Sequence, residues 1–286
     1  MGAFLARAVG NPVASPAVGC STPAVLVRFR HGSRRQATAG ALAIACGVLV
    51  AVAACGVPTK RRPEPPRAPT IPDRVAQYGP TARARLAPYF AAAGVPYPPE
   101  RFALLGFKRE RELHLLAAGP GQPLAVVRAY PILGASGDLG PKLREGDQQV
   151  PEGIYRIDYL NPNSIAHLSL GLSYPNPYDR ARAAEDGRDT LGSAIMIHGG
   201  VASVGCLAIG DRQAEELFVL AADAGWEDAV VVLSPVDFRR HSLPTDQRTP
   251  PTRWVGDLYA RLRTELAPLP LEPVRAPSAP LASAAP

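Results

Sequence analysis

A histidine and a cysteine on either side of a glycine-rich bend are the residues of this chain best suited to chemistry. His198 and Cys206 lie in the segment AIMIHGGVASVGCLAIG, residues 194–210. A thiol becomes a useful nucleophile when a neighbouring imidazole takes its proton or stabilises the thiolate. We therefore interpret Cys206 as a nucleophile and His198 as its base, oriented by the backbone carbonyl of Gly199. The N–H groups of Gly205 and Cys206 are expected to hold a developing oxyanion.

Simpler interpretations apply to the same two residues. A lone cysteine in an apolar segment is usually a small buried hydrophobe, and a lone histidine is usually structural. A zinc site is disfavoured, because no further cysteine lies nearby and the sequence has no H-E-x-x-H motif. We expect neither a metal ion nor an organic cofactor.

The elements around this segment are expected to place the pair. A short apolar strand, 194–197, delivers His198 at its end. A helix with Asp211 as its N-cap and Gly225 at its end packs a face of Ala214, Leu217, Phe218 and Ala221 behind the bend. Other expected elements are a hairpin of 111–117 and 124–133, strands 154–159, 166–172 and 229–233, a helix within 73–93 broken at Gly79-Pro80, a polar excursion or flap over 174–188, and a helix around 254–262.

The net charge gives no reason to expect nucleic-acid binding. The chain carries a formal charge of +6, with 31 basic and 25 acidic residues. Five arginines and no acidic residue precede Cys55, so the rest of the chain has 26 basic residues against 25 acidic ones. The excess positive charge therefore belongs to the segment before Cys55, which we call the leader.

The leader resembles a bacterial lipoprotein signal peptide. Arg34-Arg35 precedes an uncharged stretch, and VAAC at residues 52–55 matches a lipobox, which predicts lipidation of Cys55. An uncleaved membrane anchor is the alternative. With Cys20 and Cys46 removed and Cys55 capped, Cys206 is the one free thiol of an exported protein, where cysteines are usually paired. A proline-rich tether follows.

Three ordered motifs resemble the L,D-transpeptidase catalytic domain (YkuD-type), and within it the YafK-like subgroup. They are the HG…SxGC pattern at His198, Gly199, Ser203, Gly205 and Cys206; GPK…EGD…VPEGIY within 140–155; and LNPNS…HLSL…YPN within 160–176. Val204 stands where the broader family usually has a second histidine.

The resemblance implies a mainly β (α+β) fold, a YkuD-type mixed β-sandwich or barrel with a core helix after the nucleophile loop. It implies acyl transfer on peptidoglycan stem peptides through a thioester at meso-diaminopimelate, with no cofactor. Lys142, Arg144, Ser203 and His167 are the expected substrate contacts, although His167 also suits a hydrogen-bonded position in a sheet. The alternatives are hydrolytic release of a lipoprotein from peptidoglycan and an inactive, lipid-anchored wall-binding module.

These interpretations together predict the organisation of the chain. It divides into a signal peptide (1–54), a proline-rich tether with a short helical segment (55–101), a catalytic domain (102–265) and a disordered Pro/Ala-rich tail (266–286). The expected location is the periplasm, with a lipid anchor that suits the outer membrane. Expected partners are stem peptides, the membrane and a wall-linked lipoprotein.

Overall fold

The computed structural model describes residues 67–243 and 252–271. The predicted signal peptide, Cys55, the beginning of the predicted tether and most of the predicted tail lie outside these residues. Within the described ranges, none of the helices is long and apolar enough to cross a membrane.

A mixed sheet of eight strands forms the centre of the domain, in the order β3-β2-β1-β8-β4-β5-β6-β7. The predicted α+β class with a mixed sheet is therefore confirmed. The strands are β1 (Arg101–Phe107), β2 (Glu112–Ala118), β3 (Ala125–Pro131), β4 (Gly153–Ser164), β5 (His167–Leu172), β6 (Met196–His198), β7 (Leu207–Ala208) and β8 (Val230–Ser234).

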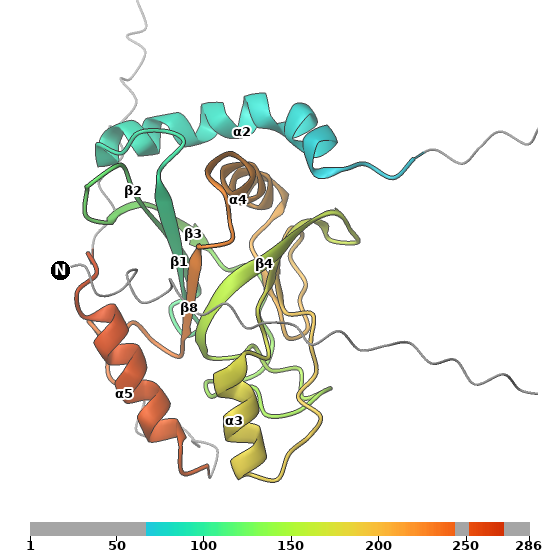
Figure 1. Cartoon of the computed structure of the whole chain (residues 1–286), viewed down its shortest axis with the longest axis vertical. Coiled ribbons are helices and arrows are strands. Elements are labelled where there is room, and N and C mark those ends of the chain that lie inside the picture. Colours follow the sequence, from blue (N-terminus) through green and yellow to red (C-terminus); the bar gives the residue numbers. More distant parts are fainter. Residues whose placement is uncertain (1–66, 244–251, 272–286) are drawn as a thin grey trace, which may run out of the picture. The chain divides into compact units, whose positions relative to one another are not determined.

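Four helices accompany the sheet in the described residues (Figure 1). They are α2 (Ile71–Ala93), α3 (Pro177–Glu185), α4 (Asp211–Ala224) and α5 (Val255–Leu266). A capping box starts α2, where the Thr70 side chain and the Asp73 carboxylate each bind the other's backbone N–H. Asn176 and Asp179 make the same arrangement at the start of α3.

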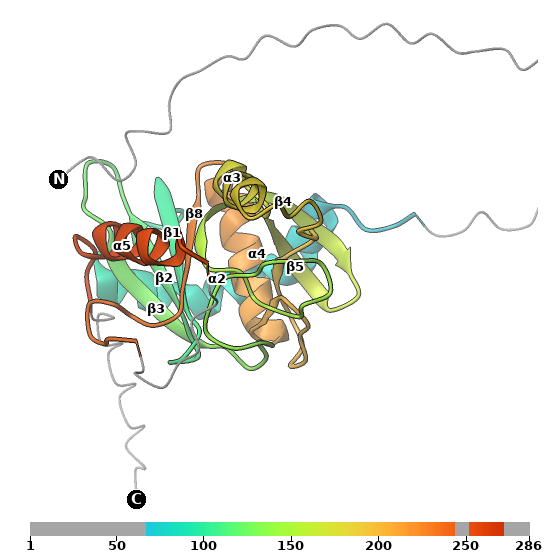
Figure 2. The ribbon, with the colours of Figure 1, turned by 90° about the horizontal axis from the view of Figure 1, so that it is seen from below.

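Figure 2 shows the ribbon of these helices and strands from below. Apolar side chains on both faces of the sheet hold the helices in place. One cluster joins α2 and α4 to the sheet, with Leu86, Phe90 and Leu217 among its buried members. The second contains residues of α5, β1 and β8, with Leu262 and Val232 among its buried members. Each fully buried leucine or phenylalanine contributes about 1.5–3 kcal/mol through the hydrophobic effect.

Ion pairs add specific contacts where α2 meets α4. The buried Glu216 carboxylate lies 2.7 Å from Nε of Arg85 in α2 and 2.6 Å from Nη1 of Arg128 in β3. Asp223 receives two hydrogen bonds of 2.7 Å from the partly exposed Arg83 guanidinium group. Removing the arginine partners of Glu216 would leave an uncompensated buried charge, so this carboxylate helps to fix how α2 sits on α4.

Several local expectations need correction. Gly79-Pro80 does not end the helix, because α2 continues through both Pro80 and Pro88. Asp211 is the first residue of α4, and Gly210 occupies the N-cap. The expected flap at 174–188 contains α3, and β1 was not predicted. The tail does not leave the domain at residue 266, since Leu269 is still buried.

Candidate active site

Strands β6 and β7 place His198 and Cys206 on the same face of the sheet. They pair in parallel, with Ile197 opposite Leu207. Both of those side chains are fully buried in the cluster that α4 covers. Because side chains alternate along a strand, His198 and Cys206 are directed to the opposite face. This is the arrangement that a histidine-activated thiol requires.

The backbone fixes both the tautomer and the orientation of the His198 ring. Its Nδ1 lies 2.7 Å from the carbonyl oxygen of Gly199, the contact expected from the sequence. Since a carbonyl oxygen can only accept, Nδ1 carries the proton when the ring is neutral. Nε2 then has a free lone pair with which to accept a proton.

The glycine turn after His198 is held from two sides. The N–H of Gly200 donates to the Asp211 carboxylate at 2.7 Å, and the N–H of Gly199 donates to the Leu168 carbonyl at 3.2 Å. The backbone of Gly199 is enclosed, because a Cβ atom there would lie 2.8 Å from the Ala166 carbonyl oxygen. Asp211 therefore positions the carbonyl that orients His198.

The Cys206 sulfur rests against the start of β6. It accepts a hydrogen bond from the Met196 N–H at 3.4 Å and donates to the Ala194 carbonyl at 3.6 Å. Burial raises the pKa of the Cys206 thiol, while the Met196 N–H and the positive charge of Lys142 act in the opposite direction. No hydrogen bond joins this sulfur to His198 in the described part of the chain, so the thiol must turn away from Ala194 before proton transfer.

Serine hydroxyls already occupy both N–H groups of the expected oxyanion hole. The N–H of Gly205 donates to Ser136 Oγ at 2.7 Å, and the N–H of Cys206 donates to Ser203 Oγ at 3.1 Å. Ser136 in turn donates to the Gln148 carbonyl at 2.6 Å. Gly205 has a φ of 79°, which favours glycine. An oxyanion must therefore displace the two hydroxyl groups.

Ser136 was not among the residues found from the sequence. It lies 69 positions before Gly205 in a loop-rich segment, and a single serine in such a segment gives no signal of its role. Ser203 was expected to contact substrate, but its hydroxyl oxygen accepts the hydrogen bond from the Cys206 N–H.

Of the two basic residues expected to contact substrate, one is used within its own loop. The Lys142 ammonium group is buried, pairs with Asp147 and donates to the Arg144 carbonyl at 2.8 Å. Its charge still favours the Cys206 thiolate. Arg144 has an exposed side chain, which is free to meet a ligand.

His167 requires a correction, since its ring does not lie on the face of the thiol. Its φ of 72° is in the left-handed region and departs from regular strand geometry. Its Nε2 lies 3.1 Å from the Glu215 carboxylate of α4, and its ring packs edge-on against Tyr78 of α2. These contacts lie on the helix-covered side, so the hydrogen-bonded structural interpretation replaces the expected substrate contact.

Tyr159 is a residue of this face that the sequence did not indicate. It pairs with Gly171 across a bulge in β4, and Gly171 pairs with Met196 next to the Cys206 sulfur. The Tyr159 ring covers Gly171, because a Cβ there would fall 2.3 Å from it. Burial raises the pKa of Tyr159, and the nearby Cys206 raises it further. The bulge hid this residue, because strict alternation would assign Tyr159 to the core face.

The described residues contain no group of three or more His, Cys, Asp or Glu side chains arranged to hold a metal ion.

Comparisons with known proteins agree with the motifs. Residues 116–233 match the family model described as the L,D-transpeptidase catalytic domain, YkuD. A relative from Escherichia coli (strain K12), named "Putative L,D-transpeptidase YafK", is 37% identical over 120 residues, which make up 41% of this chain and 46% of the relative. The chain thus spans less than half the length of this curated relative.

Two solved structures are more distant. The helical cell shape determining protein Pgp2 from Campylobacter jejuni is 19% identical, with a TM-score of 0.37, over 48% of each chain. L,D-transpeptidase 1 from Mycobacterium tuberculosis is 16% identical, with a TM-score of 0.27, over 46% of this chain and 62% of that one.

Proposed function

We propose, from the premise that residues 116–233 form a YkuD-type L,D-transpeptidase catalytic domain, that this chain transfers acyl groups on peptidoglycan stem peptides through Cys206. One observation carries the proposal. His198 and the half-buried Cys206 share one face of the sheet, and the Gly199 carbonyl leaves Nε2 of His198 free to act as a base.

The first half of the proposed reaction forms a thioester. The thiol turns from Ala194, His198 Nε2 takes its proton, and the sulfur attacks a substrate carbonyl carbon. The developing oxyanion replaces the Ser136 and Ser203 hydroxyls on the two backbone N–H groups. The C–N bond then breaks, and the amine leaves with the proton from His198.

The second half releases the acyl group. An amine or a water molecule attacks the thioester and gives its proton to His198. The C–S bond breaks, and the sulfur recovers the proton as a thiol. An amine acceptor gives a crosslink or an attachment, whereas water gives hydrolysis, so the same residues serve both outcomes.

The proposed donor is a stem peptide attacked at the meso-diaminopimelate carbonyl. Its charged groups suit the exposed Arg144 guanidinium and the acidic and basic side chains of the 138–152 loop. Cleavage of a lipoprotein–peptidoglycan link is the hydrolytic form of this proposal, and the similarity to YafK motivates it. An inactive wall-binding module is the remaining alternative. Export and lipidation at Cys55 also remain proposals, which rest on the leader sequence.

Muropeptide digestion tests the function. The purified chain and its Cys206→Ala variant are incubated with defined muropeptides, and the products are identified by mass spectrometry. We expect new crosslinked or shortened products with Cys206 only, with the same circular dichroism spectrum for both proteins. A carbapenem should add its mass to the peptide that contains Cys206.

The outcomes separate the alternatives. Shortened products alone indicate a hydrolase, and crosslinked products indicate transfer. Unchanged turnover by Cys206→Ala would remove the nucleophile assignment. Binding of muropeptides without turnover by either protein would favour the wall-binding module.

A further inference from the structure

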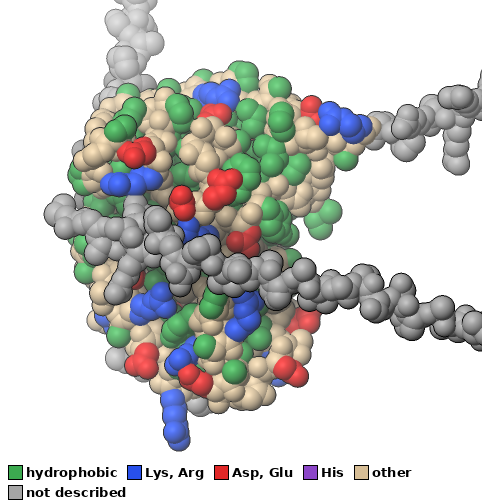
Figure 3. Space-filling view, viewed as in Figure 1, with side chains coloured by type: hydrophobic (Ala, Val, Ile, Leu, Met, Phe, Trp, Pro, Cys, Tyr) green, Lys and Arg blue, Asp and Glu red, His purple; other side chains and the backbone are tan. Residues whose placement is uncertain are grey.

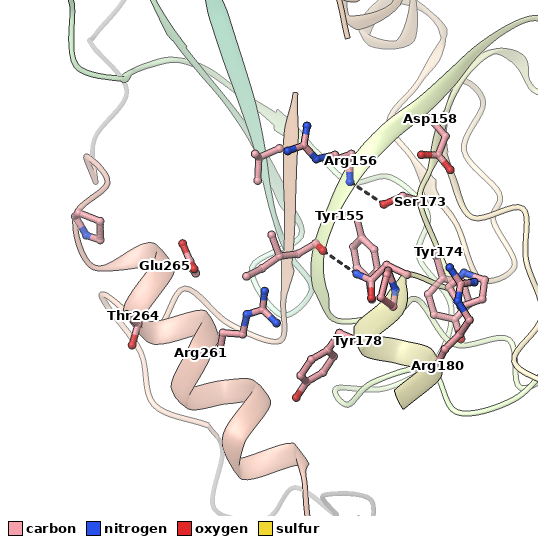
Figure 4. Close-up of a pocket in the computed structure, with 16 residues that line it drawn as sticks. Tyr155, Arg156, Asp158, Ser173, Tyr174, Tyr178, Arg180, Arg261, Thr264 and Glu265 are labelled. Atoms are coloured by element: carbon pink, nitrogen blue, oxygen red, sulfur yellow. Dashed lines mark hydrogen bonds between the residues drawn. The ribbon is translucent and has the colours of Figure 1, made fainter. Parts of the chain in front are cut away.

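A groove lined by both polar and apolar residues has no role in the chemistry described so far. Its volume is about 1340 Å³, and it lies between α5, α3 and the first half of β4 (Figure 4). Two hydrogen bonds of 2.9 Å build its wall, from the Arg156 N–H to Ser173 Oγ and from Asn176 Nδ2 to the Ile154 carbonyl. The groove is therefore a formed part of the domain.

The groove opens on the same face of the sheet as the thiol. Ile154 of its lining belongs with the α5 cluster, on the face opposite the α2–α4 core. Arg156 follows two positions later, pairs with Val230 of that cluster and shares this face. Asp158 lies at the edge of the groove, and the ring of the next residue, Tyr159, covers Gly171. Gly171 pairs with Met196, whose N–H contacts the Cys206 sulfur. The paired strands β4, β5 and β6 thus connect the edge of the groove to the Cys206 sulfur.

Two guanidinium groups of the groove are not paired with a carboxylate in the described part of the chain. Among the described residues, the side chains of Arg180 and Arg261 form no hydrogen bond or ion pair, although Arg261 lies 5.2 Å from the Tyr178 ring. Figure 4 shows Arg261 extending from α5 towards the strands. Arg156 is bound to Asp228, whose side chain is 95% exposed, so this contact is readily exchanged. Unpaired guanidinium groups favour carboxylates, which they bind through two parallel hydrogen bonds.

Acidic side chains line other parts of the same groove. Asp158 and Glu265 lie on its border, and Figure 3 shows basic and acidic side chains mixed around α5 and α3 on this face. A purely anionic ligand would be repelled by the two carboxylates, whereas a peptide with both carboxylate and ammonium groups matches the charges. Stem peptides that contain meso-diaminopimelate carry both groups.

We propose that this groove binds a second stem peptide, whose carboxylates contact Arg180 and Arg261, beside the peptide that reacts at Cys206. This proposal rests on the proposed function. A transfer reaction needs such a site, because an acceptor amine must be held near the thioester. The groove uses α5, which lies after residue 233, where the family match ends.

Calorimetric titration tests this site without turnover. The probe is the tripeptide L-alanyl-γ-D-glutamyl-meso-diaminopimelate, added to the full chain with Cys206→Ala. Adding Arg180→Gln and Arg261→Gln should weaken binding at least about ten-fold. The matched control adds Arg109→Gln and Arg212→Gln, two exposed arginines outside the groove whose side chains form no hydrogen bond or ion pair with the described residues. It should bind as the parent does, and thermal unfolding should show that each variant is folded.

Unchanged binding by the groove variant would overturn the proposal. Equal weakening by the control, or equal affinity for the tripeptide with its carboxylates amidated, would overturn it as well. Displacement of the tripeptide by millimolar inorganic phosphate would indicate a simple anion site and would also overturn it. The proposed function is tested separately, by turnover with Cys206 present. Binding that depends on Arg180 and Arg261 without any turnover would support the proposed binding site and reject the proposed reaction. Turnover together with binding that does not depend on these arginines would support the reaction and reject the binding site.

Discussion

A single methyl group on either glycine that follows His198 tests how the imidazole is oriented. At Gly199, a Cβ atom would lie 2.6 Å from the Asp211 carboxylate, 2.8 Å from the Ala166 carbonyl oxygen and 3.0 Å from the His167 Cβ. At Gly200, a Cβ atom would meet nothing within 4 Å, but the φ of 68° disfavours alanine. The two variants therefore introduce steric overlap and backbone strain separately.

Both substitutions should lower stability by similar amounts, but only one should strongly affect the reaction. An alanine in the left-handed region costs about 1–2 kcal/mol, so Gly200→Ala loses roughly that free energy of unfolding. Overpacking at Gly199 costs about 1–3 kcal/mol, and it must move the carbonyl that holds Nδ1 of His198. A displacement of about 1 Å at such a position reduces turnover about 100-fold.

The assay measures kcat and KM on defined muropeptides together with urea unfolding of both variants. We expect Gly199→Ala to lose about 100-fold in kcat, while Gly200→Ala stays within about 5-fold of the parent. Equal activities for the two variants at similar stability would refute the positioning role of the Gly199 carbonyl. An unaltered pH profile for Gly199→Ala with full kcat would lead to the same conclusion.

Two further predictions concern the serine hydroxyls and a buried carboxyl group. The Ser203 hydroxyl accepts the Cys206 N–H that the oxyanion needs, so the two compete for it. Ser203→Ala should therefore lower the free energy of unfolding by about 1 kcal/mol and speed carbapenem acylation of Cys206 roughly 5-fold. Slower acylation would contradict this competition. Burial raises the pKa of Asp179 to about 6 from 3.8, so the folded state keeps this proton over a range in which the unfolded chain loses it. Stability should therefore fall by about 3 kcal/mol between pH 4 and pH 7 through this group; urea unfolding of Asp179→Asn should show a smaller decline, and an identical pH dependence would exclude Asp179 as its source.

Periodicity made the strands and helices around the candidate site predictable. Ile195 and Ile197 before His198, and the face of α4 with Ala214, Leu217 and Phe218, are buried as their apolar pattern indicated. The hydrogen bond between the His198 ring and the Gly199 carbonyl was also predictable, because the two residues are adjacent in the sequence. The spacing of His198 and Cys206, together with the family resemblance, predicted that the two residues act as a pair.

Features that depend on distant contacts or unusual backbone were not predictable. Ser136 reaches Gly205 across 69 positions, and the bulge in β4 changes the face to which Tyr159 belongs. The left-handed φ of His167 turns its ring towards α2 and α4. Pro80 suggested a helix break, but the packing of Leu86 and Phe90 and the ion pairs to α4 outweigh the lost backbone hydrogen bond.

The way α2 is fastened to α4 also determines where a mechanical load would travel. Chain that enters the domain at Arg67 runs directly into α2, and the Arg83–Asp223 and Arg85–Glu216 pairs join that helix to α4. Tension applied before this point would be taken up in shear along two helices on the covered side of the sheet. Asp211, the first residue of α4, also holds the Gly200 N–H, so pulling on the N-terminal chain should shift the Gly199 carbonyl and change the orientation of the His198 ring.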